Sequence, residues 1–204
     1  MSRSALLVID VQNGFCHPRG SLARSGIALS GVAAAVARTA DAVASARAAA
    51  VPVVFTRHVY RPEYADLGRN LRDRSGNVAG HDGLRAGTWD AEVMPELGWS
   101  PEDLTVDKPR FDAFLWTSLD PLLAGLGADH LYVAGVVTNI CVESTVRAAY
   151  MRDFAVTVLG DACAGRTDRL HELSLSIMRE CEFAEVIPAA ELASRLSDAS
   201  RVPA

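Results

Sequence analysis

Short apolar runs alternate along the chain with longer segments of helical period. Runs rich in Val, Leu and Ile are typical of strands buried on both faces, and they fall at residues 5–9, 51–56, 103–106, 131–137, 154–159 and 184–187. Helices are expected at residues 31–50, 89–97, 117–126, 167–182 and 189–196, and from residue 138 onward. Strands that alternate with helices indicate an α/β fold. We therefore predict a Rossmann-like, three-layer fold, in which an open sheet of six mostly parallel strands carries helices on both faces.

The length of the chain is typical of a single domain. It has 204 residues, half of them apolar, which is enough to bury a full core. The sequence shows no linker, internal repeat or low-complexity segment. We expect one domain over residues 1–204.

Within the stretch 131–150, a continuous apolar run ends at Thr138, and from there on the apolar residues recur at the spacing of one helix face. Thr138 or Asn139 can cap the predicted helix. Cys141 then lies in the first helical turn, at the carboxyl end of a strand. Free N–H groups and the helix dipole favour a thiolate there, and they can also hold an oxyanion. Since most free cysteines are simply small buried residues, the position alone leaves both interpretations open.

Two further polar residues follow predicted strands. Asp10 ends the first apolar run, and Lys108 follows the third, before Pro109. A carboxylate at a buried strand end is costly unless it is hydrogen-bonded or functional, although Asp10 could also just cap a turn. Ligands bind at the carboxyl ends of strands in open α/β sheets. We therefore expect Asp10, Lys108 and Cys141 to converge there.

Two irregular segments are expected near this edge. Residues 14–30 contain Gly and Pro at intervals and predict a loop that brings Phe15 and His17 toward a pocket. Residues 57–101 form the longest irregular region, and connections of that length are usually functional. Polar and aromatic side chains in this region include His58, Tyr60, Asp66 and Trp89, and most of the others are expected to be solvated.

Composition excludes several classes of protein. The formal net charge of −5 and the lack of clustered Lys and Arg argue against a nucleic-acid partner. No apolar run approaches the roughly 18 residues of a membrane span, and Asp10 interrupts the first run too early for a signal peptide. The four cysteines show no CxxC spacing, so reduced thiols are expected. A cytoplasmic location follows as a prediction, with neither nucleic acid nor membrane as a partner.

Three motifs together resemble the isochorismatase-like cysteine hydrolases, a family that includes nicotinamidases, N-carbamoylsarcosine amidohydrolases and ureidoacrylate amidohydrolases. They are ALLVIDVQNGF near the start, DKPRFDAF in the middle and AGVVTNICVESTVRAAYMRDFAVTVLGDACAG near the end. The resemblance covers nearly the whole chain. It implies a catalytic triad of Asp10, Lys108 and Cys141, a cis peptide between Val136 and Val137, and a homo-oligomer, dimeric or tetrameric.

The resemblance also implies a mechanism. Lys108 and the helix terminus are expected to lower the pKa of the Cys141 thiol, and Asp10 to exchange protons as the thiolate attacks a carbonyl. The backbone N–H groups of Val137 and Cys141 are the expected oxyanion donors. A thioester on Cys141 is then hydrolysed by water. The expected activity is hydrolysis of a C–N bond in a small amide, ureido or N-carbamoyl substrate.

Differences from subfamilies narrow the choice of substrate. Isochorismatases that cleave a vinyl ether lack the cysteine that this chain has at position 141. Nicotinamidases carry a metal-binding Asp-x-His after the second strand, whereas this chain has Thr56-Arg57-His58. His58 and His81 are too few for a zinc site, so no metal or other cofactor is expected, and both are predicted to be loop histidines with satisfied hydrogen bonds.

The region 58–66 and Gly87-Thr88-Trp89-Asp90 look most like the ureidoacrylate and carbamoyl-amide branch. Expected substrate contacts are Phe15, His58, Tyr60, Asp66 and Trp89. The alternatives are a metal-assisted nicotinamidase-like amidase, a vinyl-ether hydrolase, and a redox or non-catalytic thiol protein. The presence of Asp10 and Lys108 argues against the last, because a redox or binding role needs no acid or base beside the thiol. No dinucleotide-binding GxGxxG follows the first strand.

Overall fold

Six parallel strands form one sheet in the computed structural model, which describes residues 3–70 and 76–199. The order across the sheet is β3-β2-β1-β4-β5-β6, and every neighbouring pair is parallel. The strands are β1 (Ser4–Ile9), β2 (Val53–His58), β3 (Leu104–Lys108), β4 (His130–Val136), β5 (Ala155–Ala164) and β6 (Glu185–Ile187). The predicted α/β fold is confirmed. Strand order reverses between β1 and β4, which is where such sheets bind ligands.

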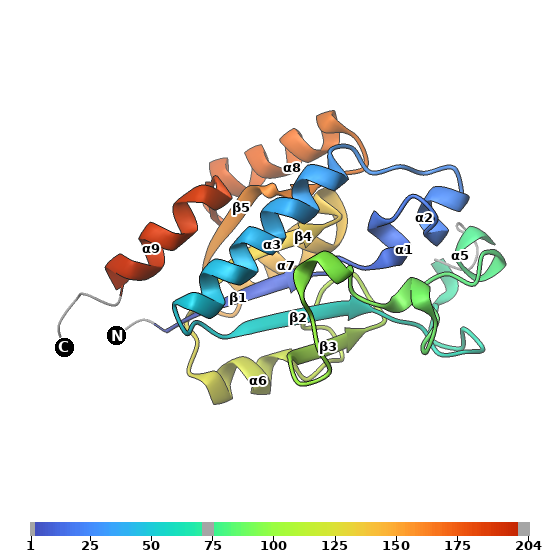
Figure 1. Cartoon of the computed structure of the whole chain (residues 1–204), viewed down its shortest axis with the longest axis horizontal. Helices are drawn as coiled ribbons and strands as arrows, with labels where there is room; N and C mark the ends of the chain where they lie inside the picture. Colours follow the sequence, from blue (N-terminus) through green and yellow to red (C-terminus); the bar gives the residue numbers. More distant parts are fainter. Residues whose placement is uncertain (1–2, 71–75, 200–204) are drawn as a thin grey trace.

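Helices cover both faces of this sheet and complete the three layers (Figure 1). Along β1, Leu6 and Val8 pack in one core with α3 and α9, while Leu7 and Ile9 pack in the other core with α6, α7 and α8. The helices are α1 (Asn13–Cys16), α2 (Ser21–Arg24), α3 (Val32–Ala48), α5 (Gly76–Gly80), α6 (Leu119–Leu126), α7 (Glu143–Tyr150), α8 (Asp168–Glu180) and α9 (Leu192–Ala199). Within residues 3–70 and 76–199, no helix is both long and apolar enough to cross a membrane.

Several boundaries differ from the sequence prediction. The expected loop over residues 14–30 contains the short helices α1 and α2. The helix expected at 89–97 is instead two separate 3-10 turns, Trp89–Ala91 and Pro95–Leu97. Of the irregular region 57–101, residues 71–75 lie outside the described part. β5 extends five residues beyond the predicted end at Leu159, because its last residues pair with the end of β4.

The segment after β4 also differs from the prediction. Thr138–Val142 is a π-helical turn, and the regular helix α7 begins only at Glu143. Neither expected cap forms, because the Thr138 hydroxyl lies 2.9 Å from Nδ1 of His171 and the Asn139 side chain accepts from the Arg166 backbone. Cys141 nevertheless lies in this first turn, directly after the strand.

Close contact between β1 and β4 fixes the edge of the sheet where the polar residues lie. Gly135, near the end of β4, has a φ of +128°. A Cβ at this position would clash with the backbone oxygen of Ile9, so only glycine lets the two strands approach here. The last residue of β1 and the turn that carries Cys141 are thereby held side by side.

Candidate active site

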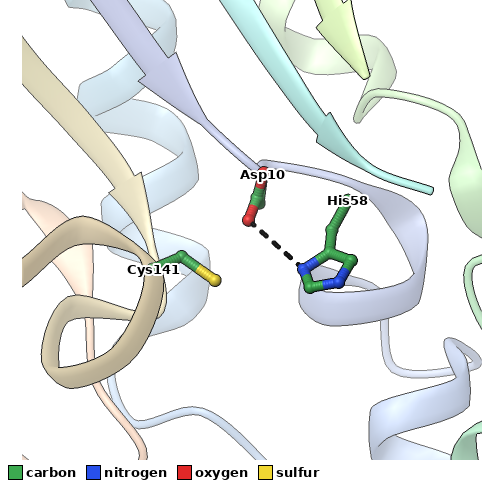
Figure 2. A group of neighbouring side chains, drawn as sticks. All are labelled: Asp10, His58 and Cys141. Atoms are coloured by element: carbon green, nitrogen blue, oxygen red, sulfur yellow. Dashed lines mark ion pairs between the residues drawn. The ribbon is translucent and has the colours of Figure 1, made fainter. Parts of the chain in front are cut away.

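Four adjacent strand ends each supply one buried polar side chain. Asp10 follows β1, His58 ends β2, Lys108 ends β3 and Cys141 lies in the turn after β4. Figure 2 shows the Asp10 carboxylate, the His58 ring and the Cys141 thiol pointing toward one another. The structure therefore brings together the three residues predicted to converge, and it adds His58 as a fourth.

Asp10 has a strained backbone and a fully buried carboxylate. Its φ is +54°, in the left-handed region that few residues other than glycine adopt. Oδ1 accepts a hydrogen bond of 2.7 Å from the Thr56 hydroxyl, and Oδ2 lies 2.6 Å from Nζ of Lys108. A strained conformation of this kind persists where many surrounding contacts hold it in place, which is often the case at functional sites. The carboxylate is thus fixed between a hydroxyl and an ammonium group.

Lys108 is buried with its ammonium group fully surrounded by acceptors. Besides the Asp10 carboxylate, Nζ donates to the backbone oxygens of Arg110 at 2.9 Å and Phe111 at 3.2 Å. Burial alone would lower the pKa of Lys108, but Asp10 and Cys141 outweigh that effect and raise its pKa above the usual value. The side chain is a fixed positive charge beside the thiol.

Cys141 has a raised pKa, contrary to the sequence prediction. Burial is the largest cause and the negative charge of Asp10 adds to it, whereas Lys108 and the backbone N–H of Val137 lower the pKa; the net result is about 12. The prediction failed because it counted the nearby charges but not the desolvation of a thiolate in a closed site. The resting residue is a neutral thiol, which must lose its proton as it attacks.

Cys16 and Cys163 are also buried, and burial raises the pKa of each thiol. Neither lines the cavity that contains Cys141. Cys141 is distinguished from them by its contacts with Asp10 and Lys108 and by its access to that cavity, rather than by a lower pKa.

His58 is not the satisfied loop histidine that the sequence predicted. Gln12 holds its backbone, accepting from the His58 N–H at 2.7 Å and donating to its carbonyl at 3.1 Å. Neither ring nitrogen has a hydrogen-bond partner in the described part of the chain. Burial, followed by the charges of Lys108 and Arg110, holds the pKa of His58 well below its usual value. The imidazole is therefore neutral.

A cavity of about 300 Å³ opens onto the thiol. Of the expected substrate contacts, Phe15, His58 and Tyr60 line it. Asp66 and Trp89 do not line the cavity, and neither does His17, which was expected near it. The Asp66 carboxylate accepts from the Arg61 backbone at 3.0 Å, and the Trp89 and His17 rings pack against each other with a centroid separation of 5.0 Å. The other lining residues are Ser21, Leu22, Ser25, Ile27, Val78, Leu84, Phe111, Val137, Ile140, Cys141 and Arg166.

Sequence reasoning missed two important features of this cavity. Arg166, after β5, lines it, and no pattern in the sequence marks that residue. Buried Asp90 joins two cavity segments, because its carboxylate accepts from the Ser21 N–H and hydroxyl at 2.8 and 2.6 Å and from the Leu84 N–H at 2.8 Å. A buried Asp with three donors is visible only once the loops are folded.

The expected oxyanion donors lie beside the thiol. The backbone N–H of Val137 lowers the pKa of the Cys141 thiol, against the larger effect of burial, and the peptide bond between Val136 and Val137 is cis. The role of the Val137 and Cys141 N–H groups in holding an oxyanion stays a prediction.

The arrangement of potential ligand atoms in the site shows how well a metal ion would fit there. Ligand atoms of Asp10, His58 and Cys141 all lie within 4.8 Å of one another, and His81 is not part of this group. A divalent cation there would lie against the Lys108 ammonium, which is already 2.6 Å from the Asp10 carboxylate. Like charges at such a separation repel strongly in a buried site. The donor set therefore fits a metal poorly, and a metal-free site stays our prediction.

Comparison with known proteins agrees with this geometry. Residues 4–191 match the isochorismatase domain. The ureidoacrylate amidohydrolase RutB of Methylobacterium radiotolerans is 36% identical over 212 residues, covering 98% of this chain and 81% of that protein. RutB of Pantoea ananatis is 34% identical over 171 residues, covering 78% and 68%. The crystal structure of a cysteine hydrolase from Pseudomonas syringae pv. phaseolicola is 32% identical with a TM-score of 0.86, covering 97% of this chain and 93% of that one. The chain belongs to the isochorismatase family.

Proposed function

We propose that the protein is a cysteine-dependent amidohydrolase that cleaves the C–N bond of a small ureido or N-carbamoyl substrate. The observation that carries the proposal is the contact of the Cys141 thiol with the buried Asp10–Lys108 pair, at a cavity that gives a substrate access to the sulfur. A redox or binding thiol needs no such pair. The two RutB relatives are named as ureidoacrylate amidohydrolases, and that name supports the substrate class.

The first half of the reaction forms an acyl enzyme. The Cys141 sulfur attacks the substrate carbonyl carbon while its proton passes to Asp10, since a thiol with a pKa of about 12 is neutral at rest. The charge on the carbonyl oxygen is held by the N–H groups of Val137 and Cys141. Asp10 then gives the proton to the departing nitrogen as the C–N bond breaks.

The second half restores the enzyme. Asp10 takes a proton from a water molecule, whose oxygen attacks the acyl carbon. The C–S bond breaks, and the proton passes from Asp10 to the sulfur. Lys108 keeps its proton throughout, because the negative charge of Asp10, and that of the Cys141 sulfur whenever it is ionised, raises the pKa of Lys108 despite its burial. Its role is to stabilise negative charge that moves between the carboxylate, the sulfur and the substrate.

The volume and the lining residues of the cavity favour a small substrate that carries an anionic group. Its volume is about 300 Å³, and the walls near the thiol are aromatic and aliphatic, with Phe15, Tyr60 and Ile140 among them. Arg166 has no ion-pair partner among residues 3–70 and 76–199, so its charge is available to the substrate. A ureido acid would place its ureido carbon at Cys141 and its carboxylate toward Arg166.

A panel of substrates tests the proposal. Ureido acids, N-carbamoyl amino acids and primary carboxamides would be compared by ammonia release, with Cys141→Ala as the inactive control. Ureido or N-carbamoyl acids should give the highest kcat/KM, and Arg166→Met should raise KM for the acids but not for their uncharged analogues. Turnover confined to simple amides, or retained by Cys141→Ala, would reject the proposed function.

A further inference from the structure

His58 is the buried polar side chain of the site for which the reaction above has no role. Gln12 fixes its backbone, and the ring lies among three aromatic rings, with centroids at 4.9 Å for Tyr60, 6.0 Å for Phe111 and 6.2 Å for Phe15. Both ring nitrogens are nevertheless without a partner in the described residues. An unpaired buried polar group costs free energy, so a rigidly held imidazole of this kind requires an explanation.

The distance between His58 and Asp10 suggests what the ring could bind. Nδ1 lies 4.0 Å from Oδ2 of Asp10, which is too long for a direct hydrogen bond. One oxygen atom can, however, hydrogen-bond to both groups across that separation. Since the Cys141 sulfur lies within 4.8 Å of both, such an atom would also lie beside the sulfur and next to an acyl carbon attached to it (Figure 2).

The charge state of His58 determines which hydrogen-bonding group its ring can bind. Its pKa is lowered first by burial and then by Lys108 and Arg110, so the ring is neutral and offers one N–H donor and one lone pair. The nearby carboxylate favours the tautomer with the proton on Nδ1. That N–H can donate to a water oxygen while the same water donates to Asp10, which leaves an oxygen lone pair for attack. A neutral imidazole with a lowered pKa is a weak base, so Asp10 takes the proton.

We propose that His58 positions the hydrolytic water against Asp10 in the second half of the reaction. The inference rests on the proposed function, because it needs an acyl group on Cys141. In this step the water oxygen forms a bond to the acyl carbon, one water proton goes to Asp10, and the C–S bond breaks. The proton then passes from Asp10 to the sulfur. His58 neither gains nor loses a proton overall.

An activated carbamate separates the two halves of the reaction. The probe is 4-nitrophenyl carbamate, whose phenolate leaves without a proton, so a burst of 4-nitrophenol reports acylation and the later steady rate reports hydrolysis. His58→Phe preserves an aromatic ring but removes both nitrogens. This variant should show a burst at least as large as the wild type and a steady rate lower by about 100-fold, the loss expected when a reactant is misplaced. Hydroxylamine, which needs no such positioning, should restore most of the steady rate.

Matched variants separate this role from a structural one. Asn carries a polar atom near the position of Nδ1 and Gln near that of Nε2, so His58→Asn should retain a faster steady rate than His58→Gln. His58→Phe should unfold at the wild-type temperature or above it, because unpaired polar atoms are removed. His130→Gln changes a histidine at the amino-terminal end of β4, the end of the strand far from the site, and should leave both phases unchanged.

Three results would overturn the inference: loss of the burst in His58→Phe, an unchanged steady rate in that variant, or a faster steady rate in His58→Gln than in His58→Asn. A burst that persists in Cys141→Ala would instead overturn the proposed function. The two failures are therefore distinguishable.

Discussion

The ammonium of Lys108 lies 2.6 Å from the carboxylate of Asp10, and both side chains are completely buried. Burying two charges costs more than their attraction returns unless further hydrogen bonds satisfy them. Here the Thr56 hydroxyl and the carbonyls of Arg110 and Phe111 complete the pair. The pair is therefore balanced as a unit, and losing one member leaves the other as an uncompensated buried charge.

Lys108→Met should consequently lower both stability and activity. Breaking a buried ion pair typically costs about 3–5 kcal/mol, which urea unfolding would measure. Lys108 is one of the groups that lower the pKa of Cys141, so its loss raises that pKa further, and kcat should fall by at least about 100-fold. Lys108→Arg should fail as well, because a planar guanidinium cannot occupy the same three contacts.

The double variant Asp10→Asn/Lys108→Met is the control for stability. Removing both charges should recover part of the unfolding free energy lost in Lys108→Met, while activity stays absent. If the double variant were less stable than Lys108→Met, the two charges would not form a compensating pair.

The lowered pKa of His58 gives a testable pH dependence of stability. An unfolded imidazole titrates near pH 6.5, whereas the folded one titrates well below it, so the unfolded chain binds more protons below pH 6.5. Stability present above pH 6.5 is therefore lost as the pH falls, by up to about 1.4 kcal/mol per pH unit. Urea unfolding between pH 7 and pH 5 should show a shallower loss in His58→Phe. Equal slopes in the two proteins would contradict a buried neutral His58.

Asp90 should influence substrate binding without touching the thiol. Asp90→Asn keeps one acceptor oxygen, so it can accept from the Ser21 N–H or from the Leu84 N–H but not from both, and one buried donor is left unpaired at a cost of about 1–3 kcal/mol. Because Ser21 and Leu84 line the cavity, KM should rise more than kcat falls. Asp82→Asn, an exposed carboxylate paired with Arg85, is the matched control and should change neither constant. A fall in kcat alone for Asp90→Asn would argue against this role.

Self-association is predicted from the family resemblance, and one helix face supports it. Leu170, Leu173 and Ile177 lie at positions i, i+3 and i+7 of α8 and are all exposed. An exposed apolar stripe of this kind is typical of protein contacts. Light scattering at micromolar concentration should show a dimer or tetramer, and Leu173→Glu should shift it toward monomer. A wild-type protein that is wholly monomeric would remove the prediction.

A polar residue after a buried apolar run identified Asp10 and Lys108 at the carboxyl ends of strands, and the change from an apolar run to helical spacing identified Cys141. The strand ends themselves were predicted less well, because β2, β3 and β5 continue past their expected ends. His58 was misplaced because β2 continues through the polar pair Arg57-His58, which the pattern cannot reveal: those residues are held in the sheet by pairing with Asp107 and Lys108 on β3.

Properties that depend on long-range contacts were predicted less well. The raised pKa of Cys141 depends on how completely the site is closed, and no local pattern reports burial of that kind. Asp66 and Trp89 were assigned to the cavity from their loop, yet the loop turns them toward Arg61 and His17. A cytoplasmic location and a single domain over residues 1–204 stay predictions from composition and length.

Mass spectrometry of the enzyme quenched during turnover tests the central claim most directly. With a ureido or N-carbamoyl substrate, the peptide that contains Cys141 should carry the mass of the acyl group, and this adduct should be absent in Cys141→Ala, which should also be inactive. Peptides that contain Cys16 or Cys163 should be unmodified. An adduct on another residue, or near wild-type turnover in Cys141→Ala, would contradict covalent catalysis at Cys141.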